Sequence, residues 1–205
     1  MLHNPTVFIV DDDDSVRRSL EWLVSSVGLK AESFSSARLF LDAYDPDRPG
    51  CLIVDMRMAD ISGLELQEQL VDRGATLPVI VMTAFGDVRT AVRAMKHGAI
   101  DFIEKPFNEQ HVLELIQSSI AEDAERREAA GNTRLVGESL KRLTPREREV
   151  LEFVVDGLSN KEIAREMGIV PKTVEVHRAR VMEKMEARSL ADLVRKFSIY
   201  QQRRG

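Results

Sequence analysis

Cys-Leu-Ile-Val-Asp, residues 51–55, is the stretch that decides the fold of the first half of this chain. Four apolar residues in succession, without a polar alternation, are typical of a strand that is buried on both faces of a sheet. Asp55 follows at the carboxyl end of this strand, the end at which open α/β sheets bind their ligands. Further strand patterns lie on both sides of it, at 6–10, 30–34, 78–82 and 101–103. The first half therefore predicts a sheet of short, buried, parallel strands.

Helical patterns alternate with these strands. They lie at about 14–27, 36–44, 62–73, 87–97 and 109–128. Glycines stand where the first, third and fourth of these helices should stop, as is common at helix ends. Strand–helix units of this size predict a doubly wound α/β domain with right-handed crossovers. In the flavodoxin-like strand order 2-1-3-4-5, the strands at 6–10 and 51–54 are neighbours.

The composition is that of a two-domain globular protein with an uneven distribution of charge. The chain has 205 residues, 43% of them hydrophobic, and a net charge of −5. Residues 1–124 carry a net charge of −10 and residues 125–205 one of +5, so the second half is suited to a nucleic-acid partner. Cys51 is the single cysteine, and the sequence has no membrane-spanning apolar run and no secretory leader. We therefore expect a cytoplasmic protein without a disulfide or a membrane segment.

The second half of the chain has a purely helical pattern. Thr144 and Glu147 form the sequence signature of a capping box, with Pro145 at the first helical position, and Ser159 and Glu162 repeat the box. Two further helices are expected to start near 171 and 189. Together these helices predict a small all-α domain of four helices, and the short turn at 168–171 is typical of a helix-turn-helix.

The segment between the halves is rich in charged helix formers. Residues 121–130 extend the last helix of the first half, and Gly131 and Asn132 are expected to break it. A coiled-coil segment would need several apolar heptads, which this stretch lacks. We therefore assign residues 1–122 to the first domain, 123–142 to a charged helical linker and 143–205 to the second domain.

Acidic side chains gather at the predicted strand ends. Asp11 and Asp12 follow the strand at 6–10, and Asp55 ends the neighbouring strand. Packed carboxylates repel one another unless a cation lies among them, and hard oxygen ligands favour Mg²⁺. Beside such an ion one carboxylate can act as a nucleophile toward a phosphoryl group. Lys105 would then pair with the phosphate and Thr83 would donate a hydrogen bond to it.

This set of residues resembles the receiver domain of two-component response regulators. The motifs are Val10-Asp11-Asp12, Val54-Asp55, Thr83-Ala84 and Lys105-Pro106. The resemblance implies that Asp55 accepts a phosphoryl group from a cognate sensor histidine kinase, and that the backbone carbonyl of Arg57 joins Asp11, Asp12 and Asp55 as a Mg²⁺ ligand. It also implies that Thr83 and Phe102 form a switch pair.

Two positions depart from the commonest receiver pattern. Ala59 stands where a proline usually follows Met58, and Phe85 stands two residues after Thr83, where histidine is frequent in the most similar subfamily. The first difference is expected to loosen the loop after Asp55.

The helix predicted from 171 to 185 is divided into a buried and an exposed face. Val174, His177, Val181 and Met185 follow the spacing of a core stripe. On the exposed side, Lys172 and Arg180 can donate to guanine or phosphate, Glu175 can accept from cytosine and Val176 can contact a thymine methyl. Arg178 borders the core stripe and suits a phosphate. The full set of predicted DNA contacts on this helix is Lys172, Thr173, Glu175, Val176, Arg178, Ala179 and Arg180.

The second half is similar to the NarL/LuxR type of helix-turn-helix and to the FixJ subfamily in particular. The matching blocks are 143–151, 160–164 and 172–185, followed by Ser189-Leu190. The resemblance implies that Lys161 also contacts a double-stranded DNA operator and that the protein forms a homodimer on phosphorylation. It further implies activation of transcription through RNA polymerase.

The sequence thus predicts a response regulator, without enzymatic turnover, whose phosphorylation on Asp55 promotes dimerisation and DNA binding. One alternative is a constitutive DNA-binding regulator with a degenerate receiver, although every expected site residue is present. Another is a Mg²⁺-dependent phosphohydrolase, which would normally carry a second acid where this chain has Arg57. Transfer of a labelled phosphoryl group to Asp55 would exclude the degenerate receiver. Turnover of a phosphomonoester would distinguish the phosphohydrolase from a response regulator.

Overall fold

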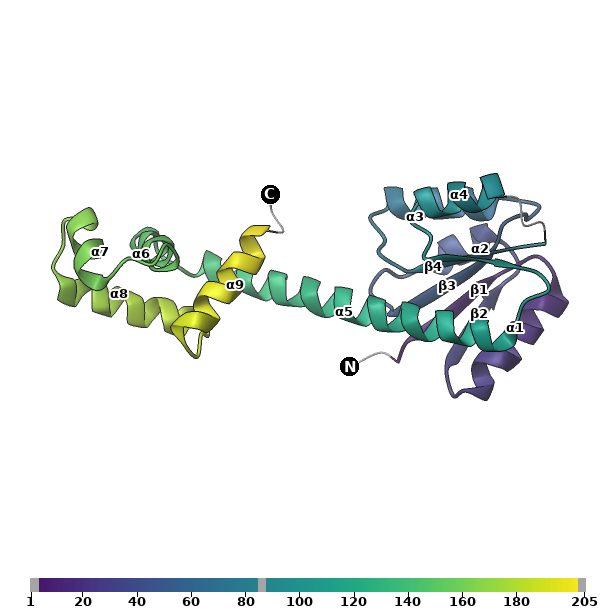
Figure 1. Cartoon of the computed structure of the whole chain (residues 1–205), viewed down its shortest axis with the longest axis horizontal. Coiled ribbons are helices and arrows are strands. Elements are labelled where there is room, and N and C mark those ends of the chain that lie inside the picture. The colour runs from purple at the N-terminus through teal and green to yellow at the C-terminus, as the bar shows by residue number, and fades with distance from the viewer. Residues whose placement is uncertain (1–3, 85–87, 203–205) are drawn as a thin grey trace. The chain divides into compact units, whose positions relative to one another are not determined.

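The computed structural model describes residues 4–84 and 88–202, leaving aside the side chains of residues 88–91. The chain divides into two compact units, residues 1–126 and residues 127–205. Each unit has its own buried core. The described part of each unit can therefore be considered by itself (Figure 1).

The first unit is built on a parallel sheet with the strand order β2-β1-β3-β4-β5, as the sequence predicted. The order reverses at β1 and β3, where Val10 pairs in register with Val54. This reversal is the topological switch point of a doubly wound sheet. The strands are β1 (Thr6–Val10), β2 (Lys30–Phe34), β3 (Gly50–Asp55), β4 (Val79–Thr83) and β5 (Asp101–Glu104).

Helices cover both faces of this sheet (Figure 1). Alternate residues of each strand point to opposite faces, so Phe8 and Val10 pack in one core while Val7 and Ile9 pack in the other. The first core receives α2, α3 and α4, and the second receives α1 and α5. These helices are α1 (Asp14–Ser26), α2 (Ala37–Ala43), α3 (Gly63–Asp72), α4 (Val88–Lys96) and α5 (Glu109–Lys141).

The second unit is helical throughout its described part. The end of α5 packs with the later helices around one core, which includes Leu140, Leu151, Ile163, Val181 and Phe197. The predicted capping boxes at Thr144 and Ser159 are both formed, which confirms the expected helix starts. The later helices are α6 (Pro145–Val155), α7 (Asn160–Met167), α8 (Pro171–Lys184) and α9 (Leu190–Gln202).

The predicted helix break at Gly131 and Asn132 is wrong. Helix α5 continues to Lys141, because packing in the second unit outweighs the low helix propensity of glycine, which amounts to about 1 kcal/mol. Val136 and Leu140 contact the core of that unit, and a carbon of the Tyr200 ring lies 3.2 Å from the position of a Cβ on Gly137. The last turns of α5, placed in the linker by the sequence, thus pack with the helical unit.

Two further features concern the helices and the single cysteine. Among the described residues, none of the helices combines the length and the apolar character needed to cross a membrane. Burial of Cys51 in β3 raises the pKa of its thiol to about 12, so this cysteine is a packed core residue and not a reactive thiolate.

The start of α3 is pressed against the strand that carries Asp55. A Cβ on Gly63 would lie 2.5 Å from the carbonyl oxygen of Asp55, so we expect Gly63→Ala to destabilise the first unit by about 1–3 kcal/mol through overpacking. Scanning calorimetry of the full chain measures this as a lower melting temperature of the first unit. Gly131→Ala is the control, because a Cβ there meets no atom within 4 Å. An unchanged melting temperature for Gly63→Ala would contradict the close contact.

Candidate functional site

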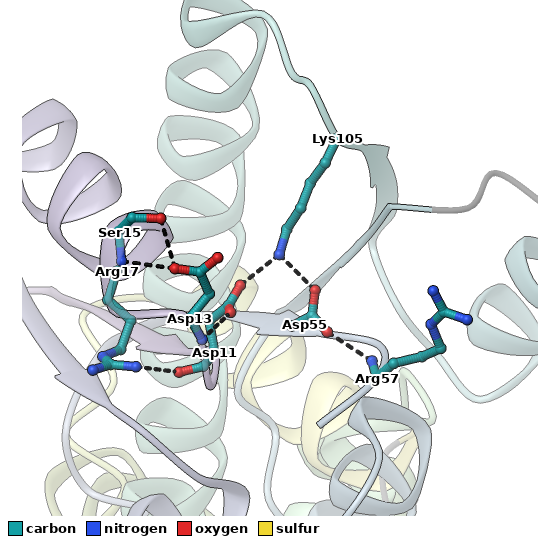
Figure 2. A network of polar contacts seen from close by, with 7 residues as sticks. All are labelled: Asp11, Asp13, Ser15, Arg17, Asp55, Arg57 and Lys105. Carbon is teal, nitrogen blue, oxygen red and sulfur yellow. Dashed lines mark hydrogen bonds and ion pairs between the residues drawn. The ribbon is translucent and has the colours of Figure 1, made fainter. Parts of the chain in front are cut away.

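The acidic residues predicted at the strand ends meet at the switch point of the sheet. Asp11 follows β1 and Asp55 ends β3, and both side chains are buried, with relative exposures of 1% and 7%. Lys105, which follows β5, extends its ammonium group between them (Figure 2). Its Nζ lies 2.6 Å from Asp11 Oδ2 and 2.6 Å from Asp55 Oδ1. Three residues from three strand ends therefore form one charged group.

Burial and pairing compete in setting the charges of this group. Burial raises the pKa of Asp11, and the hydrogen bonds from Lys105 and from the Asp13 amide oppose this effect only in part. Burial works against the charge of Lys105, but its bonds to Asp11 and Asp55 outweigh it and raise the pKa of the ammonium group. Lys105 therefore stays cationic at neutral pH and offsets the repulsion between the two acids.

The backbone around Asp55 also holds its carboxylate. The amide of Arg57 donates to Asp55 Oδ2 at 2.7 Å, while Oδ1 faces Lys105 (Figure 2). The Arg57 side chain is exposed, as is Asp12 beside the pair. One edge of the charged group is thus built into the sheet, and exposed residues of two loops flank it.

The donor chemistry of this site fits Mg²⁺. Asp11 and Asp55 supply hard carboxylate oxygens, each of which accepts one hydrogen bond and keeps a further lone pair. Within residues 4–84 and 88–202, however, no group of three or more His, Cys, Asp or Glu residues stands close enough together to hold a metal ion. The cation shared by Asp11 and Asp55 in this arrangement is the ammonium group of Lys105.

The predicted switch residues lie at the ends of β4 and in β5. Thr83 is buried, with 2% exposure, and its carbonyl accepts a hydrogen bond from the Lys105 amide at 2.7 Å. Phe102 is half-buried and packs against the core that α2, α3 and α4 share. Phe85 lies outside the described residues. Thr83 is therefore joined to the charged group through the backbone of Lys105.

Arg17 is a part of the site that the sequence did not predict. Its Nη1 donates to the Asp11 carbonyl at 2.7 Å (Figure 2). Its Nη2 donates to Asp14 Oδ1 at 2.9 Å. The spacing of Arg17 and Asp14 in a helix was a visible signal for an ion pair. The bond to the Asp11 carbonyl depends on the direction of the side chain, for which the sequence held no signal.

The second unit contains the predicted helix-turn-helix. Helix α7 ends at Gly168, whose φ of 66° places it in the left-handed conformation, and α8 begins with Pro171 at its first position. Glycine adopts that conformation without a steric cost. Val174, Val181 and Met185 are buried as predicted, and His177 is half-buried.

The predicted DNA contacts are divided between exposed and half-buried positions. Lys172 forms an ion pair with Glu175 at 2.8 Å on the surface, and the half-buried Arg178 donates to Asn160 Oδ1 at 2.8 Å. Thr173 is also half-buried. The exposed members of the set are Lys161, Lys172, Glu175, Val176, Ala179 and Arg180. These side chains are free to approach a ligand from the solvent side.

Comparison with known proteins accounts for both units. Residues 7–117 match the response regulator receiver domain family, and residues 141–197 match the bacterial regulatory proteins of the luxR family. The transcriptional regulatory protein FixJ of Azorhizobium caulinodans is 50% identical over 92% of this chain and 90% of its own length. The chain is a response regulator of the FixJ subfamily.

Other relatives agree with this assignment. The response regulator protein TodT of Pseudomonas putida is 42% identical over 92% of this chain and 83% of its own length. Among solved structures, the response regulator StyR is 46% identical over 96% of this chain and all of its own, with a TM-score of 0.87. Full-length FixJ from B. japonicum is 39% identical over 98% of each chain, with a TM-score of 0.60. This response regulator therefore carries a receiver domain and a LuxR-type DNA-binding domain.

An ion pair between a buried glutamate and a half-buried lysine joins two helices of the DNA-binding domain. Glu147 of the α6 capping box is 1% exposed, accepts from the Thr144 amide at 2.8 Å, and lies 2.6 Å from Lys184 Nζ at the end of α8. Burial works against the Glu147 charge, but the bonds from Lys184 and Thr144 outweigh it and lower the pKa to about 2. The pair thus links the start of α6 to the end of α8.

We expect Glu147→Gln to destabilise the DNA-binding domain by about 2 kcal/mol near neutral pH, because a charged hydrogen bond and an ion pair are lost. The Glu147 pKa is lower in the folded than in the unfolded chain, so its stabilisation is complete above the ordinary value of 4.5 and declines as the pH falls toward 2. Urea unfolding, followed by circular dichroism, should therefore show a difference that narrows below pH 4.5.

Glu162→Gln is the matched control. Glu162 holds the same position in the α7 capping box, but it is exposed, so a smaller loss of stability is expected. Equal losses for the two variants would show that the pair with Lys184 adds nothing to the cap.

Proposed function

We propose that Asp55 of this response regulator accepts a phosphoryl group from a partner histidine kinase. The observation that carries the proposal is the ammonium group of Lys105, which lies 2.6 Å from both Asp55 Oδ1 and Asp11 Oδ2. A cation held beside a nucleophile can balance the charge that a phosphoryl group adds there. Asp55 stands at the carboxyl end of β3, next to loops whose exposed residues leave the site open to a partner.

The transfer would proceed by displacement at phosphorus. A carboxylate oxygen of Asp55 forms the new bond to phosphorus as the bond to the kinase imidazole nitrogen breaks. That nitrogen keeps the electron pair and takes a proton from solvent, which leaves an acyl phosphate on Asp55. The Arg57 amide and Lys105 each donate to one oxygen of the Asp55 carboxylate and so fix its orientation for the attack (Figure 2). Positioning of this kind is the main protein contribution in phosphoryl transfer.

The residues that would hold Mg²⁺ are Asp11, Asp12, Asp55 and the backbone carbonyl of Arg57. When bound, the ion supplies charge neutralisation at the transferring phosphoryl oxygens. Asp11 is kept in place by the bonds to Lys105 and to the Asp13 amide. Asp12 follows Asp11 directly and is exposed, so its carboxylate would be available to an ion bound there.

The output is proposed to be dimerisation and binding of an operator. Thr83 ends β4 and its carbonyl accepts from the Lys105 amide; its hydroxyl would bond a phosphate on Asp55, and Phe102 on the adjacent β5 would follow. Two linked DNA-binding domains gain affinity through effective concentration. The DNA contacts proposed are Lys161, Lys172, Thr173, Glu175, Val176, Arg178, Ala179 and Arg180, and contact with RNA polymerase would follow.

We expect Asp55→Asn to abolish labelling by a small phosphodonor and the response of DNA binding to it. In the wild type, the phosphodonor should strengthen operator binding on the order of tenfold, which is a typical coupling between two sites. Asp42→Asn, which changes an exposed residue of α2, is the control and should respond like the wild type. Equal DNA binding and equal dimerisation of wild type and Asp55→Asn with phosphodonor would contradict the proposal and favour a constitutive regulator.

Arg180→Gln tests the proposed DNA face. We expect the slope of the logarithm of the binding constant against the logarithm of salt concentration to decrease by about 1 if Arg180 contacts phosphate, or a loss of about 1–3 kcal/mol at one base position if it reads guanine. Fluorescence anisotropy with a duplex selected from a random pool measures both. Arg195→Gln alters an exposed arginine of α9, outside the helix-turn-helix, and should leave both unchanged. An Arg180→Gln variant that binds like the wild type would remove this residue from the interface.

A further inference from the structure

Arg17 links the end of β1 to α1 through hydrogen bonds. Its guanidinium group donates to the Asp11 carbonyl at 2.7 Å and to Asp14 Oδ1 at 2.9 Å. Its backbone amide donates to the Asp13 carbonyl at 3.1 Å. The side chain is only 14% exposed, so the guanidinium is held in this geometry and does not sweep through solvent. These bonds close a loop that contains the four consecutive acids 11–14.

The loop that Arg17 closes carries four adjacent carboxylates, which repel one another. Asp13 Oδ1 accepts from the Ser15 amide at 2.8 Å and from the Ser15 hydroxyl at 2.6 Å. Asp11 is fixed on two further sides, since its Oδ1 accepts from the Asp13 amide at 2.9 Å and its Oδ2 faces Lys105. Asp12 lies between these anchored neighbours and is exposed. Without Arg17 the Asp11 carbonyl would lose its guanidinium donor, and the peptide that joins Asp11 to Asp12 would be less firmly oriented.

We propose that Arg17 is a positioning residue that fixes the backbone of the loop carrying Asp11 and Asp12, the two acids that would bind a divalent cation together with Asp55. The inference rests on the proposed function, because it assigns Arg17 a role at the same site. Groups that orient metal ligands from outside typically change metal affinity by about 10- to 100-fold when they are replaced. Arg17 acts on the backbone carbonyl of Asp11, one peptide away from Asp12, and so orients the ligands without touching the ion.

The positioning role of Arg17 and its positive charge have opposite expected effects on the affinity for a divalent cation, so the two can be distinguished. Removal of a positive charge near the acids should by itself favour a divalent cation, because it removes a repulsion. Removal of the link between β1 and α1 should disfavour the cation. Arg18 provides the matched control, because its Nε lies 2.9 Å from Asp14 Oδ2 while its side chain is 77% exposed. It has the same charge and the same acidic partner, but the Asp11 carbonyl is bonded by Arg17.

The experiment is a titration of the full chain with Mg²⁺ alone, followed by the ¹⁵N-resolved amide signals of Asp12 and Asp13. We expect Arg17→Gln to raise the Mg²⁺ concentration at half-saturation about tenfold. Arg18→Gln should leave it within about twofold of the wild type or lower it. Arg17→Lys should give an intermediate value, because an ammonium group keeps the charge but lacks the fork that bonds two acceptors at once.

A second measurement distinguishes positioning from general damage. The initial rate of phosphorylation by a small phosphodonor is measured against Mg²⁺ concentration. In Arg17→Gln the Mg²⁺ concentration at half-saturation should rise, while the rate at saturating Mg²⁺ should stay within about twofold of the wild-type rate. If Arg17→Gln does not fold, as judged by thermal unfolding, Arg17→Lys decides the matter. Equal half-saturation for Arg17 and Arg18 variants would overturn the inference.

Failure of the proposed function has a different signature. A wild-type chain that binds Mg²⁺ with the expected dependence on Arg17, but takes no phosphoryl group on Asp55, would overturn the phosphorylation proposal and leave the role of Arg17 intact. A wild-type chain whose Asp12 and Asp13 signals do not respond to Mg²⁺ would overturn the role of Arg17.

Discussion

The ammonium group of Lys105 between Asp11 and Asp55 is the interaction on which the receiver domain depends. Two buried carboxylates at adjacent strand ends are tolerated only with a cation between them, and both Nζ distances are 2.6 Å. Asp11 follows β1, Asp55 ends β3 and Lys105 follows β5, and the strand order β2-β1-β3-β4-β5 brings these three residues together. The two hydrophobic cores and the helices that cover them serve to keep these strand ends in place.

The sequence predicted most of this fold because its signals are local and repeated. Continuous apolar strands, alternating helices and capping boxes each determine one element, and their succession leaves few topologies. The prediction was wrong at Gly131, where a local helix breaker was weighed without the packing around it. Val136, Leu140 and Tyr200 supply that packing. Tyr200 lies far along the chain from the other two, and its packing beside α5 cannot be inferred from spacing.

The site was predictable to the extent that strand ends determine it. Asp11, Asp55, Lys105 and Thr83 each follow or end a strand of the sheet, so the order of the strands brings them together. Arg17 differs because it lies on a helix, and its spacing to Asp14 indicates only a surface ion pair. Its bond to the Asp11 carbonyl requires the guanidinium to turn back toward the sheet. Side-chain direction of this kind depends on tertiary packing, which no single-residue pattern encodes.

Two groups of paired charges in this protein differ in their charge balance. The Glu147 and Lys184 pair lies inside one domain, with Glu147 1% exposed and also held by the Thr144 amide. The group around Lys105 instead carries one cation for two carboxylates, and the exposed Asp12 and Arg57 lie at its edge. Its unbalanced negative charge favours a further cation, and a phosphoryl group on Asp55 would change the balance again. The Glu147 and Lys184 pair therefore stabilises one conformation, whereas the charge balance of the group around Lys105 changes with the ligand bound there.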